Sequence, residues 1–290
     1  MADLGGPPLE LLLDIFTDAL LDSLKMLPFL FGAYLLMEWL EHRSGEGMEK
    51  LLAGARRLGP VTGALLGCVP QCGFSVAAAN LYAGRVITMG TLAAVFLSTS
   101  DEAVPLLLGA PEKAGVLLPL LALKVLVGAL AGMLIDRTAR GKVSAHREGI
   151  HDLCRHCHCE EGNILPAALR HTGSIFLFVL LVNLALGGGV ALLGEEQLSA
   201  LLLSESFLQP AAAALLGLIP NCAASVLLTR LYLAGAVDFA SLAAGLLPAS
   251  GVGLTVLFRA NPRLRENLLI LALIWGTGTA VGLFLRLLGF

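Results

Sequence analysis

The stretch ALLGCVPQCGFSV at residues 64–76 occurs a second time, in altered form, as ALLGLIPNCAASV at residues 214–226, which is 150 positions later. The same register runs without a gap from residues 64–107 onto 214–257, and 16 of the 44 aligned pairs are identical. Matches of leucine or alanine arise by chance in an apolar chain, whereas the matched glycine, proline, cysteine, serine and tyrosine residues rarely do. The sequence therefore contains an internal duplication.

The duplication divides the 290 residues into three parts. We predict a first membrane repeat at residues 1–140, a linker at 141–162 and a second membrane repeat at 163–290. The pair Gly128 and Gly278 extends the register beyond the aligned block.

The composition places both repeats in a lipid bilayer. Hydrophobic residues make up 57% of the chain and charged residues 14%, against about 25% charged residues in a typical soluble domain. The mean hydropathy is +0.82, and a soluble fold of this size could not bury so much apolar surface. With a net charge of −3, the chain also lacks the basic character of a nucleic-acid-binding protein. A soluble enzyme, a disordered chain and a nucleic-acid partner are therefore not expected.

Each half contains five apolar segments, of which the third is short and begins at a proline. The segments lie near residues 11–40, 51–68, 70–84, 88–109 and 115–135, and near 164–193, 200–218, 220–235, 239–258 and 267–288. Because proline cannot donate an intrahelical hydrogen bond, we expect Pro70 and Pro220 to lie near the tips of short helical hairpins. Such breaks survive at membrane depth only when protein or a watery cavity surrounds them. The predicted fold is an all-α polytopic membrane protein with about ten transmembrane segments in two repeats of five.

The positive charges set the predicted orientation. If the N-terminus is extracytoplasmic, 14 of the 19 Lys and Arg residues fall on one face, in loop 41–59, at Arg85, and in segments 137–170 and 259–265. The positive-inside rule assigns that face to the cytoplasm. In the inner membrane, the linker is then cytoplasmic and both termini are extracytoplasmic. Each half crosses an odd number of times, so the repeats are predicted to be inverted, with a site near mid-membrane at their interface.

The two proline-containing loops are the first candidate site. They contain Pro70, Gln71, Cys72 and Ser75 in the first half and Pro220, Asn221, Cys222 and Ser225 in the second. A broken helix frees backbone carbonyl and amide groups for a substrate. The thiols of Cys68, Cys72 and Cys222 could supply soft ligands for a thiophilic metal or metalloid. The alternative is a tight packing turn, in which small residues allow close helix contact.

The second candidate is Ser98-Thr-Ser-Asp101-Glu102, which places two carboxylates in the middle of an apolar segment. Carboxylates at this depth usually face a cavity and serve ion or proton transfer. Because neighbouring acids repel each other, Asp101 and Glu102 favour sharing a proton or a cation. The alternative is a kinked segment with both acids at the membrane interface. Lys124, in another apolar segment, is either a counter-ion to these acids or a side chain that snorkels to the interface.

A third candidate is the stripe formed by Asp14, Asp18 and Asp22 in the first apolar segment. Their i, i+4, i+8 spacing puts the three carboxylates on one face of a helix. Since this helix is predicted to start outside, the stripe could be an acidic path for cations. The alternative is an amphipathic helix end at the membrane surface, with Lys25 paired to Asp22.

The linker is the fourth candidate because metal-ligating residues are dense in it. The ligand types are His151, Cys154, His156, Cys157, His158 and Cys159. Cys154 and Cys157 have a zinc-like spacing, but no second spaced pair completes a closed structural site. Labile capture of a thiophilic or borderline metal is the functional interpretation. The alternative is a polar loop with incidental ligands.

The titratable candidates belong almost entirely to the first half. The equivalents of Asp14, Asp18, Asp22, Asp101, Glu102 and Lys124 are Ile164, Ala168, Thr172, Gly251, Val252 and Ile274, none of which ionises. Arg230 is the exception, since it replaces Asn80 and could attract an anionic group or close a gate. The scaffold is thus predicted to be symmetric and its charge chemistry asymmetric.

Several of these stretches resemble a family of ten-helix heavy-metal exporters, described as arsenic-efflux-like permeases or manganese transporters. The resemblance rests on CVPQCGFSVAAANLYAGR (68–85), FLSTSDEAVPLLL (96–108), PFLFGAYLLMEWLEH (28–42) and the His/Cys-rich centre before EEGN. It implies ten helices and the efflux of a heavy metal, and it assigns no ligand beyond these motif positions.

The leading hypothesis is a secondary exporter of a heavy-metal ion or metalloid, coupled to protons. The expected partners are this cargo, protons and the lipid bilayer, without a tightly bound cofactor, and a homo-oligomer is left open. The sequence lacks a GxxxxGK[ST] phosphate-binding loop, an HExxH motif and a clear nucleophile–base pair, so ATP hydrolysis and other enzymatic activity are not expected. The alternative is a carrier for an organic or lipid-linked anion, with Arg85 and Arg230 near the head group.

Overall fold

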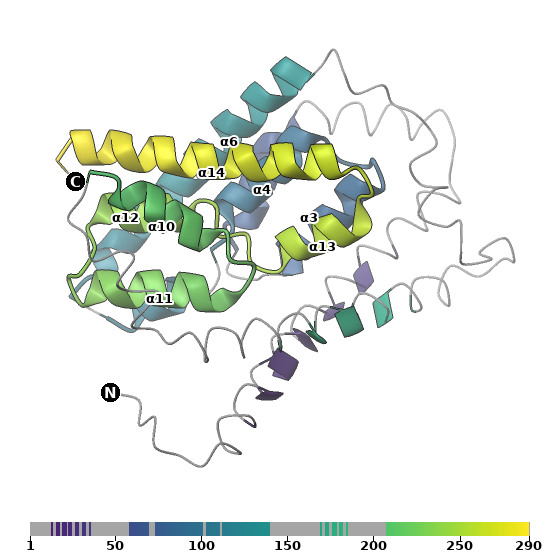
Figure 1. Ribbon diagram of the computed structural model, residues 1–290, viewed down its shortest axis with the longest axis horizontal. Coiled ribbons are helices and arrows are strands. Elements are labelled where there is room, and N and C mark those ends of the chain that lie inside the picture. The colour runs from purple at the N-terminus through teal and green to yellow at the C-terminus, as the bar shows by residue number, and fades with distance from the viewer. Residues whose placement is uncertain are drawn as a thin grey trace, which may run out of the picture.

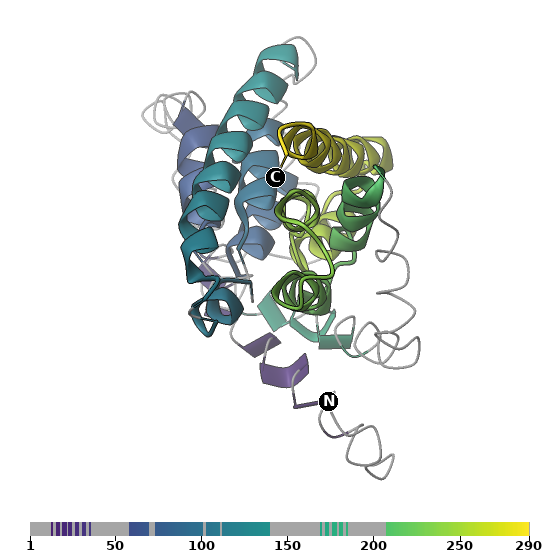
Figure 2. The ribbon, with the colours of Figure 1, turned by 90° about the vertical axis from the view of Figure 1, so that its left-hand side faces the viewer.

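A computed structural model of the chain describes residues 58–69, 73–100, 103–110, 112–139 and 207–289, together with single helical positions within 13–35 and 169–184. All regular secondary structure in these residues is helical. The expectation of an all-α protein is therefore confirmed for the described part of the chain. Figure 2 shows the helices of the first half, in blue and teal, beside those of the second half, in green and yellow.

The helices follow the same order in both halves. The first half contains a helix at Leu58–Gly67, α3 at Gly73–Ala83, α4 at Met89–Ser98, α5 at Ala103–Leu108, a 3-10 turn η1 at Ala114–Val116 and α6 at Leu117–Ala139. The second half contains α10 at Gln209–Gly217, α11 at Cys222–Leu233, α12 at Phe239–Leu246, α13 at Gly253–Ala260 and α14 at Leu264–Leu287. The starts of α4 and α12 lie 150 residues apart, as do those of α5 and α13. The sequence duplication is thus also a duplication of helices.

Two long helices carry the clearest membrane signal. The segments Leu117–Thr138 and Leu264–Leu287 each have a mean hydropathy of 2.2 and are long enough to cross a bilayer, and Met89–Leu108 also has the length and composition of a span. On α6, Leu126, Leu130 and Leu134 form an exposed apolar stripe, which suits contact with lipid. Such a distribution, with leucines outward, is expected for a helix at the lipid boundary rather than in water.

Small residues hold the long helices against the core. A Cβ placed on Gly128 of α6 would lie 2.9 Å from the carbonyl oxygen of Ala94 in α4, and one placed on Gly278 of α14 would lie 2.8 Å from that of Ala244 in α12. These are equivalent contacts, because both pairs are 150 residues apart. The repeated glycines therefore have a packing reason, namely that a side chain there would push the long helix away.

The two halves exchange contacts in a reciprocal way. Helix α3 packs against α13, and its equivalent α11 packs against α5, so each half's third helix lies on the other half's broken segment. Figure 1 shows α3 beside α13 at one end of the molecule and α11 at the other. Helix α4 also contacts α14. The core is consequently built between the halves as well as within each of them.

The central helix of each half is interrupted, whereas the sequence analysis offered a kink only as an alternative and only in the first half. Segments 88–109 and 239–258 were each expected as one apolar stretch, but α4 ends at Ser98 before α5 begins at Ala103, and α12 ends at Leu246 before α13 begins at Gly253. The signal was present in the second half, because Pro248 cannot continue a helix. Both interruptions lie in the interior, where Thr99 and Ser250 are each 1% exposed.

The predicted break at Pro220 coincides with a gap between helices. Helix α10 ends at Gly217 and α11 begins at Cys222, with Pro220 between them. In the first half, the helix Leu58–Gly67 ends before Pro70 and α3 begins at Gly73. Pro70 itself is outside the described residues, and the hairpins, like the domain boundaries, stay predictions.

Candidate functional site

A lysine ammonium lies where the two interrupted helices end. Lys124 is 1% exposed, and its Nζ donates to the carbonyl oxygen of Leu246 at 2.6 Å and to that of Thr99. Thr99 follows the last residue of α4, and Leu246 is the last residue of α12. The ammonium on α6 of the first half thus joins the carboxyl ends of one helix from each half.

Helix geometry explains why a cation is stable at this position. The last four carbonyl groups of a helix lack intrahelical partners, and the helix dipole adds partial negative charge there. At Lys124 two such helix ends share one ammonium. Its positive charge and its N–H donors stabilise the partly negative carbonyl oxygens of both ends. Of the two interpretations offered for Lys124, snorkelling is wrong, because its charged end is buried. The counter-ion interpretation stays a prediction, since Asp101 and Glu102 are outside the described residues.

The first helix of each proline-containing pair ends beside the same centre. A Cβ on Gly67 would run into the hydroxyl of Ser98 and would lie 2.7 Å from the carbonyl oxygen of Val95 in α4. A Cβ on its equivalent Gly217 would run into the carbonyl of Gly245 in α12. Gly67 and Gly217 are therefore each packed against one of the two helices that end at Lys124. The neighbouring Cys68, a free and partly exposed cysteine, lies within electrostatic range of the lysine.

The described residues of the proline loops make mostly local contacts. The side chain of Asn221 caps α11 by accepting from the N–H of Ala223 at 3.4 Å, and the Ser225 hydroxyl donates to the carbonyl of Cys222 at 2.8 Å. Cys222 is buried. In this second loop, the side-chain oxygen of Asn221, which was expected to face a substrate, accepts a hydrogen bond at the start of α11.

Ser75, in contrast, lies at the junction between the halves. A Cβ placed on Gly253, the first residue of α13, would lie 2.7 Å from both Cβ and Oγ of Ser75. Ser75 is fully buried. Its position against a residue adjoining the second interruption connects the first proline loop with the broken helix of the other half.

Several candidate residues are outside the described part of the chain, and their predicted roles stay predictions. They are Pro70, Gln71, Cys72, Asp101, Glu102, Asp14, Asp18, Asp22, His151, Cys154, His156, Cys157, His158 and Cys159. Among the residues that the structure does describe, no group of three or more His, Cys, Asp or Glu side chains could hold a metal ion.

A charged cluster joins the halves at one end of α3. Arg85 donates from Nη1 to Oε2 of Glu266 at 2.9 Å and from Nη2 to the Asn261 side chain at 3.3 Å. The hydroxyl of Tyr82 donates to the same Glu266 oxygen at 3.2 Å, and the guanidinium lies 5.2 Å from the Tyr82 ring centre. We call Tyr82, Arg85, Asn261 and Glu266 the arginine clamp. Its ion pair neutralises Arg85, which weakens the alternative that this arginine holds an anionic cargo.

The equivalent end of α11 carries a simpler contact. Lys113, between α5 and η1, donates to the carbonyl oxygens of Tyr232 and Leu233 at 2.8 and 3.2 Å. Its Nζ also lies 4.8 Å from the centre of the Tyr232 ring. We call Lys113 and Tyr232 the lysine clamp. The repeated pair Tyr82 and Tyr232 was visible in the sequence, but the two tyrosines have different partners, Glu266 of α14 for Tyr82 and Lys113 for Tyr232. Arg230, the other predicted anion ligand, is exposed on α11.

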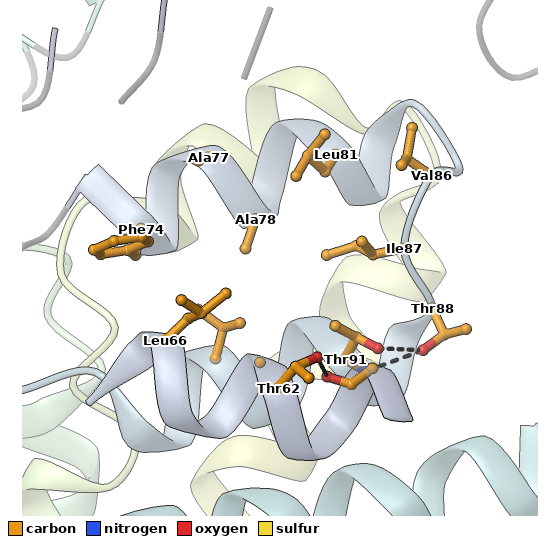
Figure 3. A pocket seen from close by; sticks show the side chains of 13 residues that line it. Thr62, Leu66, Phe74, Ala77, Ala78, Leu81, Val86, Ile87, Thr88 and Thr91 are labelled. Atoms are coloured by element: carbon orange, nitrogen blue, oxygen red, sulfur yellow. Dashed lines mark hydrogen bonds between the residues drawn. The ribbon is translucent and has the colours of Figure 1, made fainter. Parts of the chain in front are cut away.

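A cavity of about 210 Å³ lies between the helix Leu58–Gly67 and α3. Leu66, Phe74, Ala78 and Leu81 are among its apolar lining residues, and the hydroxyls of Thr88 and Thr91 approach each other to 2.8 Å at one side (Figure 3). Sequence reasoning had no means to find this space, because it depends on how the small residues of the two helices, such as Gly63 and Ala78, lie across from one another after folding.

The long apolar helices, the lipid-facing leucines and the paired interruptions together define a multi-pass membrane protein of the transporter type. A family model described as "Putative, 10TM heavy-metal exporter" matches residues 9–192. This match covers more than half of the chain, so the chain belongs to that family, and the resemblance noted from the motifs is confirmed. No curated protein and no solved structure matches the chain.

Proposed function

We propose that this protein exports a heavy-metal ion or metalloid across the inner membrane as a secondary transporter, without a tightly bound cofactor or enzymatic activity. The observation that supports the proposal most is the meeting of two interrupted helices, one from each half, at the buried ammonium of Lys124. In transporters, discontinuous helices at a repeat interface are where substrate and coupling ions bind. The family to which the chain belongs supplies the class of cargo.

The proposed transport mechanism is alternating access between two inverted repeats. Reciprocal contacts support a two-fold relation of the halves, because α3 packs on α13 and α11 on α5. A two-fold relation requires this reciprocity, in which each contact has a counterpart with the roles of the halves exchanged. Combined with the distribution of positive charges, it favours an axis in the membrane plane, with both termini extracytoplasmic.

The proposed cargo route begins at the linker and passes the centre of the bundle. The His/Cys-rich linker captures cytosolic metal, which suits the soft and borderline ligands that it contains. Cargo then reaches the carboxylates of Asp101 and Glu102, which lie between α4 and α5 in the sequence. Protons moving inward through these acids would supply the driving force. Rocking of the halves against each other then opens the route outward.

The test is transport in inverted membrane vesicles, measured by elemental detection for a panel of metals and metalloids, with and without a pH gradient. We expect gradient-dependent uptake of at least one metal by the wild type. Asp101→Asn combined with Glu102→Gln should reduce that uptake at least tenfold, because the amides cannot carry a proton or a charge. Glu112→Gln is the matched control, since Glu112 is exposed in the loop after α5.

Two outcomes would contradict the proposal. If no metal is transported under either condition, the protein is not a metal exporter. If the double amide variant transports as well as Glu112→Gln, the acids are not part of the route. Loss of transport in Arg230→Gln alone would instead favour the carrier of an anionic substrate.

A further inference from the structure

We infer that the carbonyl oxygens of Thr99 and Leu246 form a site for a hard monovalent cation, which the ammonium of Lys124 fills as a tethered ion. The inference concerns the ion chemistry at the centre of the proposed exporter and to that extent rests on the proposed function. It predicts that a free alkali cation binds between the two helix ends when the ammonium is removed.

The geometry of the two helix ends carries the inference. Both carbonyl groups bond to one nitrogen atom, with the Leu246 oxygen at 2.6 Å. They belong to different halves, and each lies at a helix carboxyl end, where the dipole attracts positive charge. The ammonium is 1% exposed, so bulk water does not replace these contacts. An enclosed point between two negative helix ends is a cation site by its electrostatics.

Further oxygen atoms are present at these two helix ends and in the interruptions that follow them. Ser98, Ser100 and Ser250 are buried there, and the Ser100 hydroxyl donates to the carbonyl of Ser98 at 3.1 Å. Hydroxyl and carbonyl oxygens are hard ligands, which suit alkali cations rather than thiophilic metals. Unwound backbone and half-helix carboxyl ends coordinate sodium or protons in transporters with inverted repeats. The site is therefore chemically distinct from the thiol-containing positions proposed for the cargo.

The duplication shows that only one of the two equivalent helices has a charged side chain at this position. The equivalent of Lys124 in the second half is Ile274, which is fully buried. The second half accommodates a shorter apolar side chain at this position. Lys124 therefore adds a charge that the equivalent position of the second half lacks. Because this charge is covalently attached, the wild-type cycle is expected to need no alkali cation.

The experiment measures the thermal stability of the purified full-length protein in detergent. Lys124→Met removes the ammonium and keeps most of the side-chain length. When N-methylglucamine chloride is replaced by sodium, potassium or lithium chloride at equal ionic strength, at least one cation should raise the Tm of this variant by about 4 °C. A shift of that size corresponds to a site at about ten times its Kd. The wild type should show no such shift.

Two controls separate the site from general salt effects. Lys113→Met removes another lysine that donates to helix carbonyls, but only those of α11, and its Tm should not depend on the cation. Lys124→Arg keeps a tethered charge and should also be insensitive. Equal Tm values for Lys124→Met in all four salts would overturn the inference. So would failure to purify Lys124→Met in any alkali salt while Lys124→Arg purifies normally.

The readout does not involve cargo and is independent of the vesicle assay. A cation-dependent Tm in Lys124→Met, together with no metal transport by the wild type, would support the site and contradict the exporter. Metal transport by the wild type, together with a cation-independent Tm in Lys124→Met, would support the exporter and contradict the cation site.

Discussion

The two halves of the molecule place different residues on the same helices. At the middle of the long helix, the first half has Lys124 and the second has Ile274, and both are buried. Lys124 bonds to the ends of α4 and α12, whereas the isoleucine contributes only to the apolar core. A duplicated scaffold therefore tolerates either a charged or an apolar side chain at this position.

The turn after the third helix shows a second difference. Arg85 has a φ of 61°, and its equivalent Gly235 has a φ of 77°. The capping bonds are the same, since the N–H of Arg85 bonds to Tyr82 and that of Gly235 to Tyr232. Glycine adopts this left-handed conformation without cost, whereas a residue with a Cβ loses about 1–2 kcal/mol there. The first half thus accepts strain at Arg85, and the arginine clamp offsets it.

Packing between the second and third helices differs as well. Ala77 and Ala78 line the cavity in the first half, and their equivalents Leu227 and Leu228 are buried in the core of the second. At these three positions the first half has a cavity, a buried charge and a strained backbone. The second half has a filled core, an apolar side chain and a glycine.

The largest expected effect comes from removing this difference at Lys124. Lys124→Ile introduces the residue of the second half and leaves two buried carbonyl groups without their donor. We expect the free energy of unfolding to fall by about 3 kcal/mol, because each unpaired buried acceptor costs about 1–3 kcal/mol. Denaturant titration of the purified protein measures this change. Ile274→Val is the control for a small change at the equivalent position, and equal stability of the two variants would mean that the ammonium bonds contribute nothing.

The second prediction concerns the arginine clamp. Glu266→Gln removes the charge that binds Arg85, Tyr82 and Arg263 and should lower the free energy of unfolding by about 1.5 kcal/mol. The estimate is the upper end for a single hydrogen-bonded contact, because the pair is partly screened by water. Arg265→Gln, at an exposed neighbour, is the control. A double-mutant cycle with Arg85→Gln should give a coupling energy, and a coupling of zero would contradict the clamp.

The third prediction makes the first half resemble the second at the cavity. Ala78→Leu should raise the free energy of unfolding by about 1 kcal/mol, as cavity-filling substitutions commonly do. Ala79→Leu is the matched control on the same helix. Ala79 is fully buried outside the cavity lining, so leucine there should destabilise through overpacking. If both substitutions destabilise equally, the space between the helices is not available to a side chain.

The smallest expected effect is that of Arg85→Gly. The substitution loses the ion pair with Glu266 but relieves the left-handed strain, so the two changes should cancel to within about 0.5 kcal/mol. Gly235→Arg, in contrast, should destabilise, because it adds strain without a carboxylate partner at the lysine clamp. Chemical denaturation of both variants tests the comparison. A large loss in Arg85→Gly would show that the clamp outweighs the strain.

The sequence allowed the helical class, the duplication and the family to be predicted. These follow from local properties, since apolar length indicates membrane helices and an offset of 150 residues is visible in one dimension. It also singled out Lys124 and Ser75, which the structure places at the junction of the halves. The break after Ser98 was considered only as a kink, on the polar residues Ser98–Glu102, and the break after Leu246 was missed although Pro248 signalled it.

What the linear sequence determined is therefore the kind of protein and the repeated positions that build it. The tertiary structure decided which atoms meet, above all the two helix ends at Lys124 and the charged residues opposite Tyr82 and Tyr232. Backbone carbonyl groups occur at every position and leave no trace in residue identity. Only folding determines which of them lose their helical partners and face the same charge.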